Sequence, residues 1–371
     1  MQIRDAIPAV ARRLLVAIAI VLASTNAWAD ERPVQSVKPA GATVNFAQTL
    51  DWIGDDVFAV GRWDGTISVF RVPEAKEYGP VILQAMSTPA GRGIEMLAAV
   101  GNSAFVTSDG AQSLALWRRP AAGTPFKLAA SLGYDPSIGT ANSGLAFESN
   151  GVGYLISGHE SGHVLVWRRM ADDDYQLAAT VDVRSPEAPS NPWGLRNVRG
   201  LVRWQSDRLI AGSEDGDLVA ITIPEGREIF RHRYNAKAQR GINGLSAVGD
   251  KLLVANCAVG ASDRNIWLFD LSQGRPVLSD SENLVLDSGR AQVFNFDVDL
   301  VAVPNSGGTK DLIFFSSTEE GLLWQGRVQG DQVVMDGVTR ISPEGAAIMA
   351  VGPKGNVLAT AAYAIRLFKT K

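Results

Sequence analysis

The residues with the most obvious potential for chemistry are His159-Glu160-Ser161-Gly162-His163. They satisfy the H-E-x-x-H pattern, in which two histidines one helical turn apart bind zinc and the glutamate acts as a base. Here the segment contains Gly162, follows Gly158, and lies between two runs of alternating apolar residues. Such a pattern predicts a β-hairpin turn, in which the two histidines share no helical face. We therefore interpret the match as false and expect no metal site at these residues.

A second candidate for chemistry is an oxygen-rich stretch, Phe296-Asp297-Val298-Asp299, together with Asn305 and Asp311. Carboxylate and amide oxygens are calcium ligands, but the spacing fits no calcium loop, and the alternating aspartates are typical of an exposed strand. His232 is the single further histidine, too few for copper or haem enzymes of the propeller type. The sequence contains no G-x-S-x-G motif and no phosphate-binding loop. These observations predict no cofactor and no metal.

The hairpin that contains the two histidines belongs to a repeated unit. Residues 153–169, GYLISGHESGHVLVWRR, read as a strand, a polar turn and a second strand that reaches Trp167. Similar phrases recur along the chain and reach Phe70, Trp117, Ile221, Phe269, Trp324 and Phe368. Consecutive positions in this series lie 44 to 55 residues apart, a spacing that indicates a repeat architecture.

Each repeat contains two further strand-like runs, such as residues 143–147 before a hairpin and residues 175–183 after it. Four short strands in about 50 residues are typical of one blade of a β-propeller. The sequence therefore predicts an all-β, seven-bladed propeller of four-stranded antiparallel blades, formed as one domain by residues 30–371. The last repeat has three strands, and we expect residues 34–38, VQSVK, to complete it and close the ring without an open sheet edge.

The hairpins resemble the WD-repeat family. GRWDGTISVFRV, GHESGHVLVWRR and GSEDGDLVAITI share its order of glycine, acidic turn residue, glycine, alternating aliphatic residues and, in the first two, a terminal aromatic residue. The Gly-His that usually opens the repeat and the Trp-Asp that ends it are missing, and Trp117 and Trp167 are each followed by arginine. The chain thus resembles secreted bacterial WD-like propellers. That resemblance implies a platform for protein partners, with enzymes and enzyme subunits as the minority.

The N-terminus has the pattern of an export signal. Residues 1–29 combine Arg4, Arg12 and Arg13 with the apolar run 14–23 and end in a small-x-small site at Ala27-Trp28-Ala29. The apolar run is too short to span a bilayer comfortably, and no later apolar stretch approaches the length of a membrane span. We therefore predict a cleaved signal and a periplasmic or secreted protein without a membrane span. The general secretory route is favoured over the twin-arginine route.

Charge and cysteine content narrow the function further. Residues 1–29 contain three arginines and one aspartate, so their removal changes the formal net charge from −4 to about −6. An acidic chain argues against nucleic acid as a partner, because phosphate binding needs a concentrated basic face. The single cysteine, Cys257, excludes a disulfide framework and has no histidine near it in the sequence, so we interpret it as a buried, unreactive thiol.

Two sets of charged residues are expected on one face of the ring. Acidic residues recur in the hairpin turns, at Asp64, Asp109, Glu160, Asp215, Asp263 and Glu320. Arginines recur just before the innermost strands, at Arg92, Arg199, Arg240 and Arg290. One interpretation is structural, with turn hydrogen bonds and salt bridges between blades. The other is a channel mouth lined by arginines for an anionic ligand or an acidic partner segment.

The longest connections are expected at residues 184–197, which carry Trp193 and Arg196, and at residues 301–311 inside the sixth blade. We predict a non-catalytic platform that binds an envelope or secreted protein. The candidate binding residues are Trp63, Arg92, Trp193, Arg196, Arg199, Arg240 and Arg290. One alternative is an enzyme, or the propeller subunit of a periplasmic redox enzyme, that binds a small anionic substrate at the central channel. Another is a module that binds carbohydrate or lignin fragments through exposed tryptophans.

Overall fold

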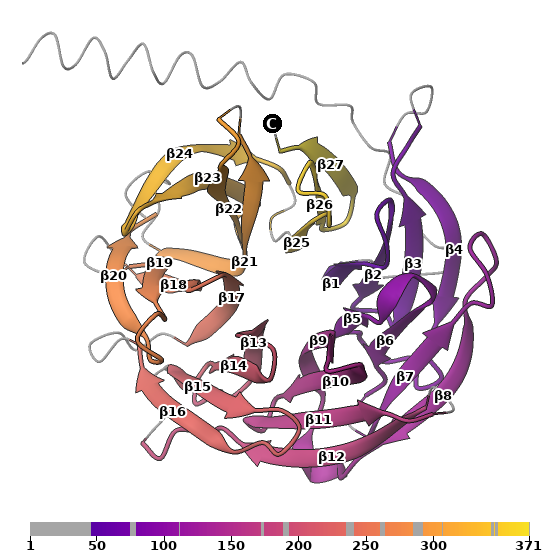
Figure 1. Ribbon diagram of the computed structural model, residues 1–371. Coiled ribbons are helices and arrows are strands. Elements are labelled where there is room, and N and C mark those ends of the chain that lie inside the picture. The colour runs from indigo at the N-terminus through magenta and orange to yellow at the C-terminus, as the bar shows by residue number, and fades with distance from the viewer. Residues whose placement is uncertain are drawn as a thin grey trace, which may run out of the picture.

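The computed structural model of this chain describes residues 46–370 with gaps. Outside the description lie residues 1–45, 75–78, 111, 172–173, 188–192, 235–240, 260–263, 285–291, 306, 343–344, 346–347 and 371. The described strands surround a central opening, and Figure 1 shows β1, β5, β9, β13, β17, β21 and β25 around it. The expected signal peptide, the closing strand at residues 34–38, Arg240, Asp263 and Arg290 lie outside the described residues.

The strands form seven consecutive antiparallel units, which are the blades of a β-propeller. The first blade consists of β1 (Ala47–Trp52), β2 (Val57–Arg62), β3 (Thr66–Arg71) and β4 (Val81–Ser87). The second consists of β5 (Leu97–Ala99), β6 (Ala104–Ser108), β7 (Ser113–Arg118) and β8 (Lys127–Gly133). The third blade consists of β9 (Ala141–Ser149), β10 (Val152–His159), β11 (His163–Arg169) and β12 (Tyr175–Asp182). The fourth consists of β13 (Val198–Arg203), β14 (Arg208–Ser213), β15 (Asp217–Thr222) and β16 (Glu228–Arg233).

The fifth blade consists of β17 (Ile242–Val248), β18 (Lys251–Val259), β19 (Ile266–Asp270) and β20 (Val277–Glu282). The sixth consists of β21 (Gln292–Pro304), β22 (Lys310–Thr318), β23 (Leu322–Gln329) and β24 (Gln332–Arg340). The last blade is β25 (Ile348–Val351), β26 (Val357–Ala361) and β27 (Ile365–Lys369). β18 also pairs with β21, so blades five and six share one continuous sheet. The helices among the described residues are two short 3-10 turns, Gly101–Ser103 and Pro136–Ile138. The predicted seven-bladed all-β propeller is confirmed.

The hydrophobic core is divided among the contacts between neighbouring blades. One cluster joins the third and fourth blades through Ile156, Val166, Leu209 and Val219, and each other pair of neighbouring blades has a cluster of the same kind. This arrangement follows from the sequence, because the middle strands of each blade are apolar at nearly every position and are covered on both faces. The blades therefore stabilise one another around the ring.

The repeated aromatic positions have a common geometry. Trp167 lies in the third strand of its blade, beside a β-bulge that bends the outermost strand. Bulges follow Val69, Leu116, Ala220 and Leu268 at the matching places. Trp117 and Trp167 donate their indole hydrogen bonds to Thr107 and Ser157 at 3.1 and 3.2 Å. In blade six the bulge falls after Gln325, so Gly326 and not the expected Trp324 holds the repeat position.

The first and last blades meet in the described residues. Ala47, Trp52 and Phe58 of the first blade pack with Ala359 and other apolar residues of the last. The indole of Trp52 donates a hydrogen bond to the carbonyl oxygen of Ala350 at 3.0 Å, and the backbone N–H of Ala47 donates one to Ala362 at 3.1 Å. These contacts bring the two ends of the repeat series together, while a fourth strand for the last blade stays a prediction.

One expected loop is wrong. Residues 301–311 do not form a long connection, because β21 extends to Pro304 and β22 begins at Lys310. Asn305 bridges the short turn between them by donating hydrogen bonds to Thr309 and Asp311 at 2.7 and 2.9 Å. Local side-chain bonds of this kind build tight turns from residues that resemble a loop in sequence. The expected long segment at residues 184–197 does connect β12 with β13.

Candidate functional site

The centre of the ring contains a cavity of about 870 Å³, to which every blade contributes at least one lining residue. Its walls are the innermost strands and the backbone just before them, for example Leu97 of β5, Gly144 of β9 and Met349 of β25. Consecutive residues of these strands line the cavity, for example residues 47–52 of β1, because the innermost strand forms the inner edge of each blade. The chemistry of the site is therefore set by seven short segments that lie far apart in sequence.

The described wall of this cavity is acidic. Its carboxylates are Asp51, Glu95, Glu214, Asp297, Asp299 and Glu319. Among the described lining residues Arg199 is the one basic side chain, and its Nε atom lies 3.2 Å from Oε1 of Glu214. Burial raises the pKa of Glu214, and the charge of Arg199 opposes that shift. Among the described lining residues, acidic side chains therefore outnumber basic ones by six to one.

Three of these carboxylates accept hydrogen bonds from a neighbouring blade. Asp51 in β1 accepts a hydrogen bond from the backbone N–H of Ala99 in β5 at 2.8 Å. Asp299 in β21 accepts one from Val351 in β25, also at 2.8 Å. Asp297 also accepts one from β25 and lies two residues before Asp299, so both side chains are on the same face of β21. The ring closure at the first, sixth and last blades thereby places three carboxylates along one arc of the wall.

The electrostatic environment of these carboxylates favours their protonated forms. Burial raises the pKa of Asp51 to about 6. Burial and the negative charge of Asp51 raise the pKa of Asp299 to about 7. The pKa of Asp297 is raised well above its usual value, first by burial and then by the charge of Asp299. Although these side chains border the cavity, protein surrounds them closely enough to limit their hydration.

Apolar side chains lie at the rim of the same cavity. Trp193 and Leu195 come from the connection between β12 and β13, and Phe294 and Phe296 come from β21 on another part of the ring. The ring centroids of Trp193 and Phe294 are 6.3 Å apart with a tilt of 49°. Trp193, Leu195 and Phe296 are 59, 40 and 37% exposed. We call these four residues the apolar mouth.

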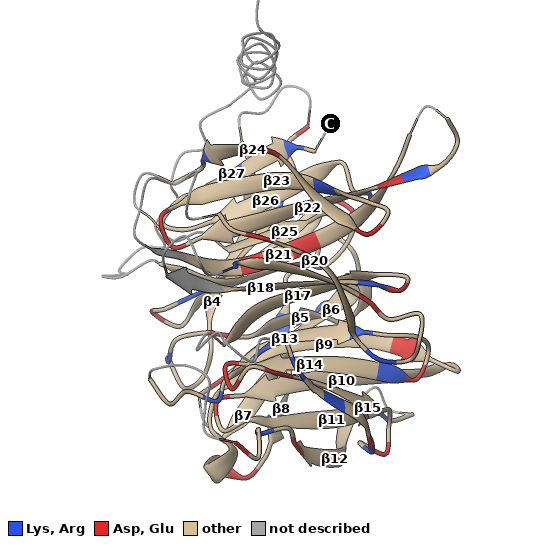
Figure 2. Cartoon of the chain, turned by 90° about the vertical axis from the view of Figure 1, so that its left-hand side faces the viewer, with Lys and Arg blue, Asp and Glu red and all other residues tan. Residues whose placement is uncertain are grey.

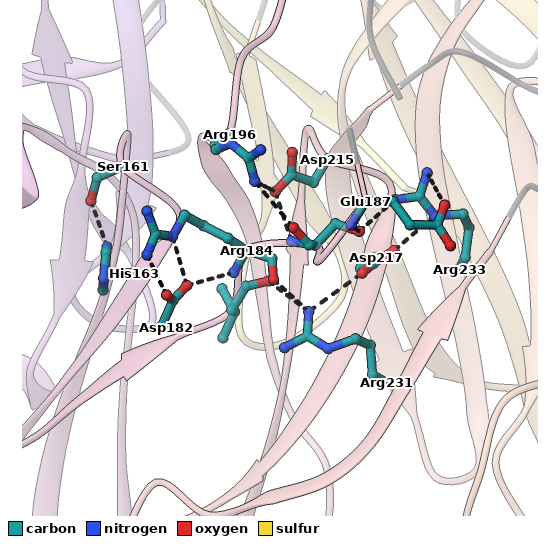
Figure 3. Close-up of polar contacts among 12 residues, drawn as sticks. Ser161, His163, Asp182, Arg184, Glu187, Arg196, Asp215, Asp217, Arg231 and Arg233 are labelled. Atoms are coloured by element: carbon teal, nitrogen blue, oxygen red, sulfur yellow. Dashed lines mark hydrogen bonds and ion pairs between the residues drawn. The ribbon is translucent and has the colours of Figure 1, made fainter. Parts of the chain in front are cut away.

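The connection that carries Trp193 is held at both ends by one buried carboxylate (Figure 3). Oδ2 of Asp215 accepts hydrogen bonds from the backbone N–H of Ser185 at 2.9 Å and from Nη1 of Arg196 at 3.0 Å. Arg196 also donates to the carbonyl oxygen of Ser185 at 3.3 Å. Because the Asp215 side chain is fully buried, this arrangement, which we call the Asp215 clamp, is shielded from competing water.

A second buried carboxylate supports the start of the same connection. Asp217 pairs with Arg231 at 3.3 Å and with Arg233 at 3.1 Å (Figure 3). Arg231 donates to the carbonyl oxygen of Val183 at 3.0 Å, and Arg233 donates to the hydroxyl of Ser185 at 2.6 Å. Charge-assisted hydrogen bonds of this kind fix geometry strongly when they are shielded from water. The strand β16 therefore braces the residues that lead to Trp193.

The structure places the sequence-predicted binding residues in three different situations. Trp193 and Arg199 line the cavity, whereas Arg196 belongs to the Asp215 clamp. Trp63 and Arg92 are exposed but do not border the cavity. Arg196 and Arg199 form ion pairs with Asp215 and Glu214 of the fourth blade, so these two pairs do not connect different blades, and the binding role of the set stays a prediction.

Some of the turn carboxylates also have structural contacts. Asp64 accepts hydrogen bonds from the backbone and hydroxyl of Thr66 at 3.0 and 2.7 Å, and Asp109 accepts one from the backbone of Ala90 at 2.9 Å. These bonds close turns or hold an adjacent loop, as local aspartate hydrogen bonds commonly do. They agree with the structural interpretation of the acidic turn residues, in which these side chains form turn hydrogen bonds.

The binding residues predicted from the sequence did not include the acidic wall or three of the four residues of the apolar mouth, Leu195, Phe294 and Phe296. Residues 294–299, FNFDVD, alternate apolar and polar side chains, which correctly indicated a strand. The expectation that Asp297 and Asp299 are exposed as on an outer strand is wrong, because β21 is an innermost strand and both residues border the cavity. Asn305 and Asp311 lie in the hairpin after this strand.

The H-E-x-x-H segment is a hairpin, as its glycines predicted. β10 and β11 pair directly, with Gly158 opposite Val164. His159 is buried, and its ring nitrogens lie 3.0 Å from the carbonyl oxygen of Gly139 and 2.8 Å from the hydroxyl of Ser157. Burial lowers its pKa to about 4. No group of three or more potential metal ligands gathers among the described residues.

Comparisons with known proteins place the fold. No family model and no curated protein matches the chain. A chain of a crystal structure titled mitotic checkpoint complex has a TM-score of 0.63 and 15% identity, over 92% of this chain and 98% of the other. The β-propeller domain of Cps50 (Swd1) from Myceliophteria thermophila has a TM-score of 0.65 and 14% identity, over 91 and 100% of the two chains. The chain has a WD-repeat-like propeller fold.

Proposed function

We propose that this protein is a non-catalytic platform that binds another protein over the central cavity, on the face of the ring that carries Trp193. The observation that carries the proposal is the Asp215 clamp, which fixes both ends of the connection that exposes Trp193 and Leu195 at the apolar mouth. Exposed apolar side chains on a braced loop have no evident role in the stability of the ring. They are the type of residue that anchors protein interfaces.

Rigidity supports the same proposal. Loop ends that are already fixed lose little conformational entropy when a partner binds, so more of the contact energy appears as affinity. Asp217, Arg231 and Arg233 brace the start of the connection through the hydrogen bonds described above. Trp193 also contacts Phe294, which comes from a strand that is distant in the sequence. We therefore expect binding with little rearrangement of the propeller.

The place of action is part of the proposal. Residues 1–29 have the pattern of a cleaved export signal, which supports a periplasmic or secreted protein and an envelope or secreted partner. None of the described helices is long and apolar enough to cross a membrane. Figure 2 shows charges of both signs interspersed over the visible loops, without one continuous basic stripe across the described part, which supports a partner other than nucleic acid.

A second candidate function is a site for a small molecule, as in an enzyme or an enzyme subunit. The raised pKa values of Asp51 and Asp299 in a cavity favour it, since shifted carboxylates concentrate at functional sites. The excess of acidic over basic side chains among the described lining residues, however, disfavours the anionic substrate that the sequence suggested. A neutral or cationic small molecule is the version that the wall supports.

Site-specific photo-crosslinking in the native envelope tests the platform. A benzoylphenylalanine at position 195 reports on the apolar mouth, and the same residue at position 278 reports on the outer strand β20, where Leu278 is also exposed. We expect an adduct of one defined mass from position 195 and none of that mass from position 278. Adducts that form from the outer strand alone would contradict docking at the mouth.

A further inference from the structure

We infer that the partner segment received by the apolar mouth is basic, and that one of its lysine or arginine side chains enters the cavity beside Asp297 and Asp299. This inference rests on the proposed function and adds the chemistry of the partner. It combines two observations that are independent of each other: an exposed apolar rim and an acidic wall beneath it. The apolar rim receives the partner, and the charge of the wall selects which partner it is.

The first argument is charge complementarity. Asp51, Asp297 and Asp299 border the cavity along one arc, and Arg199, the one basic lining residue that the structure describes, pairs instead with Glu214. Interfaces place opposite potentials against each other, which attracts the correct partner and repels acidic ones. A segment that brings a positive charge therefore fits this cavity better than a neutral or acidic segment.

The second argument concerns the hydrogen bonds of the carboxylates. Oδ2 of Asp299 accepts from the backbone of Val351, and no donor from the described residues is placed on its Oδ1 atom. Asp297 accepts from the backbone of Val298 through Oδ1 and also from the backbone of Met349. Neighbouring carboxylates with raised pKa values gain from a cation, which offsets their mutual repulsion and supplies N–H donors. An ammonium or guanidinium group provides both.

The third argument is the order of the layers along the entry path. Trp193 and Phe294 lie at the mouth, and Phe296, Asp297 and Asp299 follow Phe294 along β21. Lysine and arginine have apolar stems and charged ends, so their stems contact apolar surface while the charge reaches a polar layer. Aromatic rings also attract cations that approach their faces. The layering matches a long basic side chain better than a bare metal ion.

The cavity size is consistent with one segment and not with a folded domain. Its volume of about 870 Å³ lies in the range of sites that enclose a drug-sized molecule. We therefore expect one or two side chains to enter while the rest of the segment lies across the mouth. The partner's remaining surface would contact the exposed loops on the same face, including Trp63.

Fluorescence anisotropy with defined peptides tests the inference on the purified full chain. The probes are labelled ten-residue peptides with a Gly-Ser frame, one leucine, and arginine two positions later. Matched peptides carry citrulline, which is neutral and similar in shape, or glutamate in place of the arginine. We expect the arginine peptide to bind about tenfold more tightly than the citrulline peptide, and salt to weaken that preference.

Variants identify the carboxylates responsible. In Asp297→Asn/Asp299→Asn the arginine peptide should fall to the affinity of the citrulline peptide, while the citrulline peptide should be unchanged. Asparagine keeps an oxygen that can accept the Val351 hydrogen bond, and a thermal melt reports whether the variant folds. Glu319→Gln, on the same wall, is the second variant if the double substitution does not fold. Leu278→Ala on β20 is the control and should change neither affinity.

The possible results separate the two proposals. If arginine and citrulline peptides bind equally, or if the variants weaken both equally, the basic partner is excluded while a platform at the mouth survives. If spermine or calcium binds these carboxylates and the arginine peptide does not, the inference is likewise overturned. If no peptide binds and crosslinks form from position 278 alone, both the basic partner and docking at the mouth fail.

Discussion

The Nη1 atom of Arg196 lies 3.0 Å from Oδ2 of Asp215, whose side chain is completely buried. The same oxygen accepts the backbone N–H of Ser185 at 2.9 Å, so residues eleven positions apart meet at one carboxylate. Between them lies the segment that carries Trp193. A propeller stabilises its blades through apolar contacts, and this polar clamp instead fixes a loop at the channel mouth.

The clamp predicts how the loop responds to substitution. Asp215→Ala leaves the Ser185 N–H and the Arg196 guanidinium without their acceptor, and such a loss lowers the free energy of unfolding by about 1–3 kcal/mol. Trypsin should also cut faster after Arg196. Urea unfolding and timed proteolysis measure both effects.

The matched control for the clamp is Asp182→Ala. Asp182 pairs with Arg184 nearby, but both side chains are about half exposed, so the change should be about 0–1 kcal/mol. Equal losses for the two substitutions would show that burial of Asp215 gives the clamp no special stability.

The second prediction concerns pH and Asp299. Its pKa is about 7 in the folded state against 3.8 for the ordinary side chain. The folded protein therefore holds a proton that the unfolded chain releases in this window, and stability falls as pH rises from about 4 to 7. Asp299→Asn removes this loss, so its melting temperature should exceed that of the unaltered protein at pH 8.

Melting curves from pH 5 to 8 test the sign of this dependence. In Asp299→Asn part of the pH dependence of stability should remain, because burial also raises the pKa values of Asp51 and Asp297. The remaining charged lining residues that the structure describes are Glu95, Arg199, Glu214 and Glu319. A variant that is less stable than the unaltered protein at pH 8 would mean that the ionised Asp299 stabilises the fold.

A third prediction has the opposite sign. Burial lowers the pKa of His159 to about 4, below the ordinary value of 6.5, so its contribution to stability is present above pH 6.5 and is lost as pH falls toward 4. His159→Gln should reduce this loss, and at pH 7 it should cost about 1–3 kcal/mol by disturbing the bonds to Gly139 and Ser157.

Denaturant unfolding at pH 7 and pH 5 measures the effect of His159. His163→Gln in the same hairpin is the control, because His163 is less buried and its ring contacts Ser161. If the two variants show the same pH dependence, the buried imidazole is not the group responsible.

The fourth prediction concerns ring closure. β27 pairs with β26 in the described residues, and residues 34–38 are expected to add the fourth strand beside it. A chain that starts at residue 39 should melt at a lower temperature and self-associate through the open edge, whereas a chain that starts at residue 34 should not. Calorimetry and size-exclusion chromatography distinguish them. Identical behaviour of both truncations would exclude the closing strand.

The number and type of blades were predictable from the sequence because those signals are local. The hairpin of residues 153–169 carries its own alternation and its own turn glycine, and those are enough to reject a zinc helix at His159 and His163. Trp117 and Trp167 recur at the third strand for the same reason, since every blade must present apolar residues to both neighbours. A repeat of this kind can be recognised without knowing which distant residues contact each other.

Tertiary structure alone decided what lines the channel. Alternation around Asp297 indicates a strand, but not that this strand is the innermost one of its blade and borders the cavity. The charge of Asp51 raises the pKa of Asp299 only because ring closure brings the first and sixth blades near one another. Arg196, predicted at a binding face, instead reaches Asp215. The electric field inside the ring sums over strands hundreds of residues apart, and sequence order does not encode that sum.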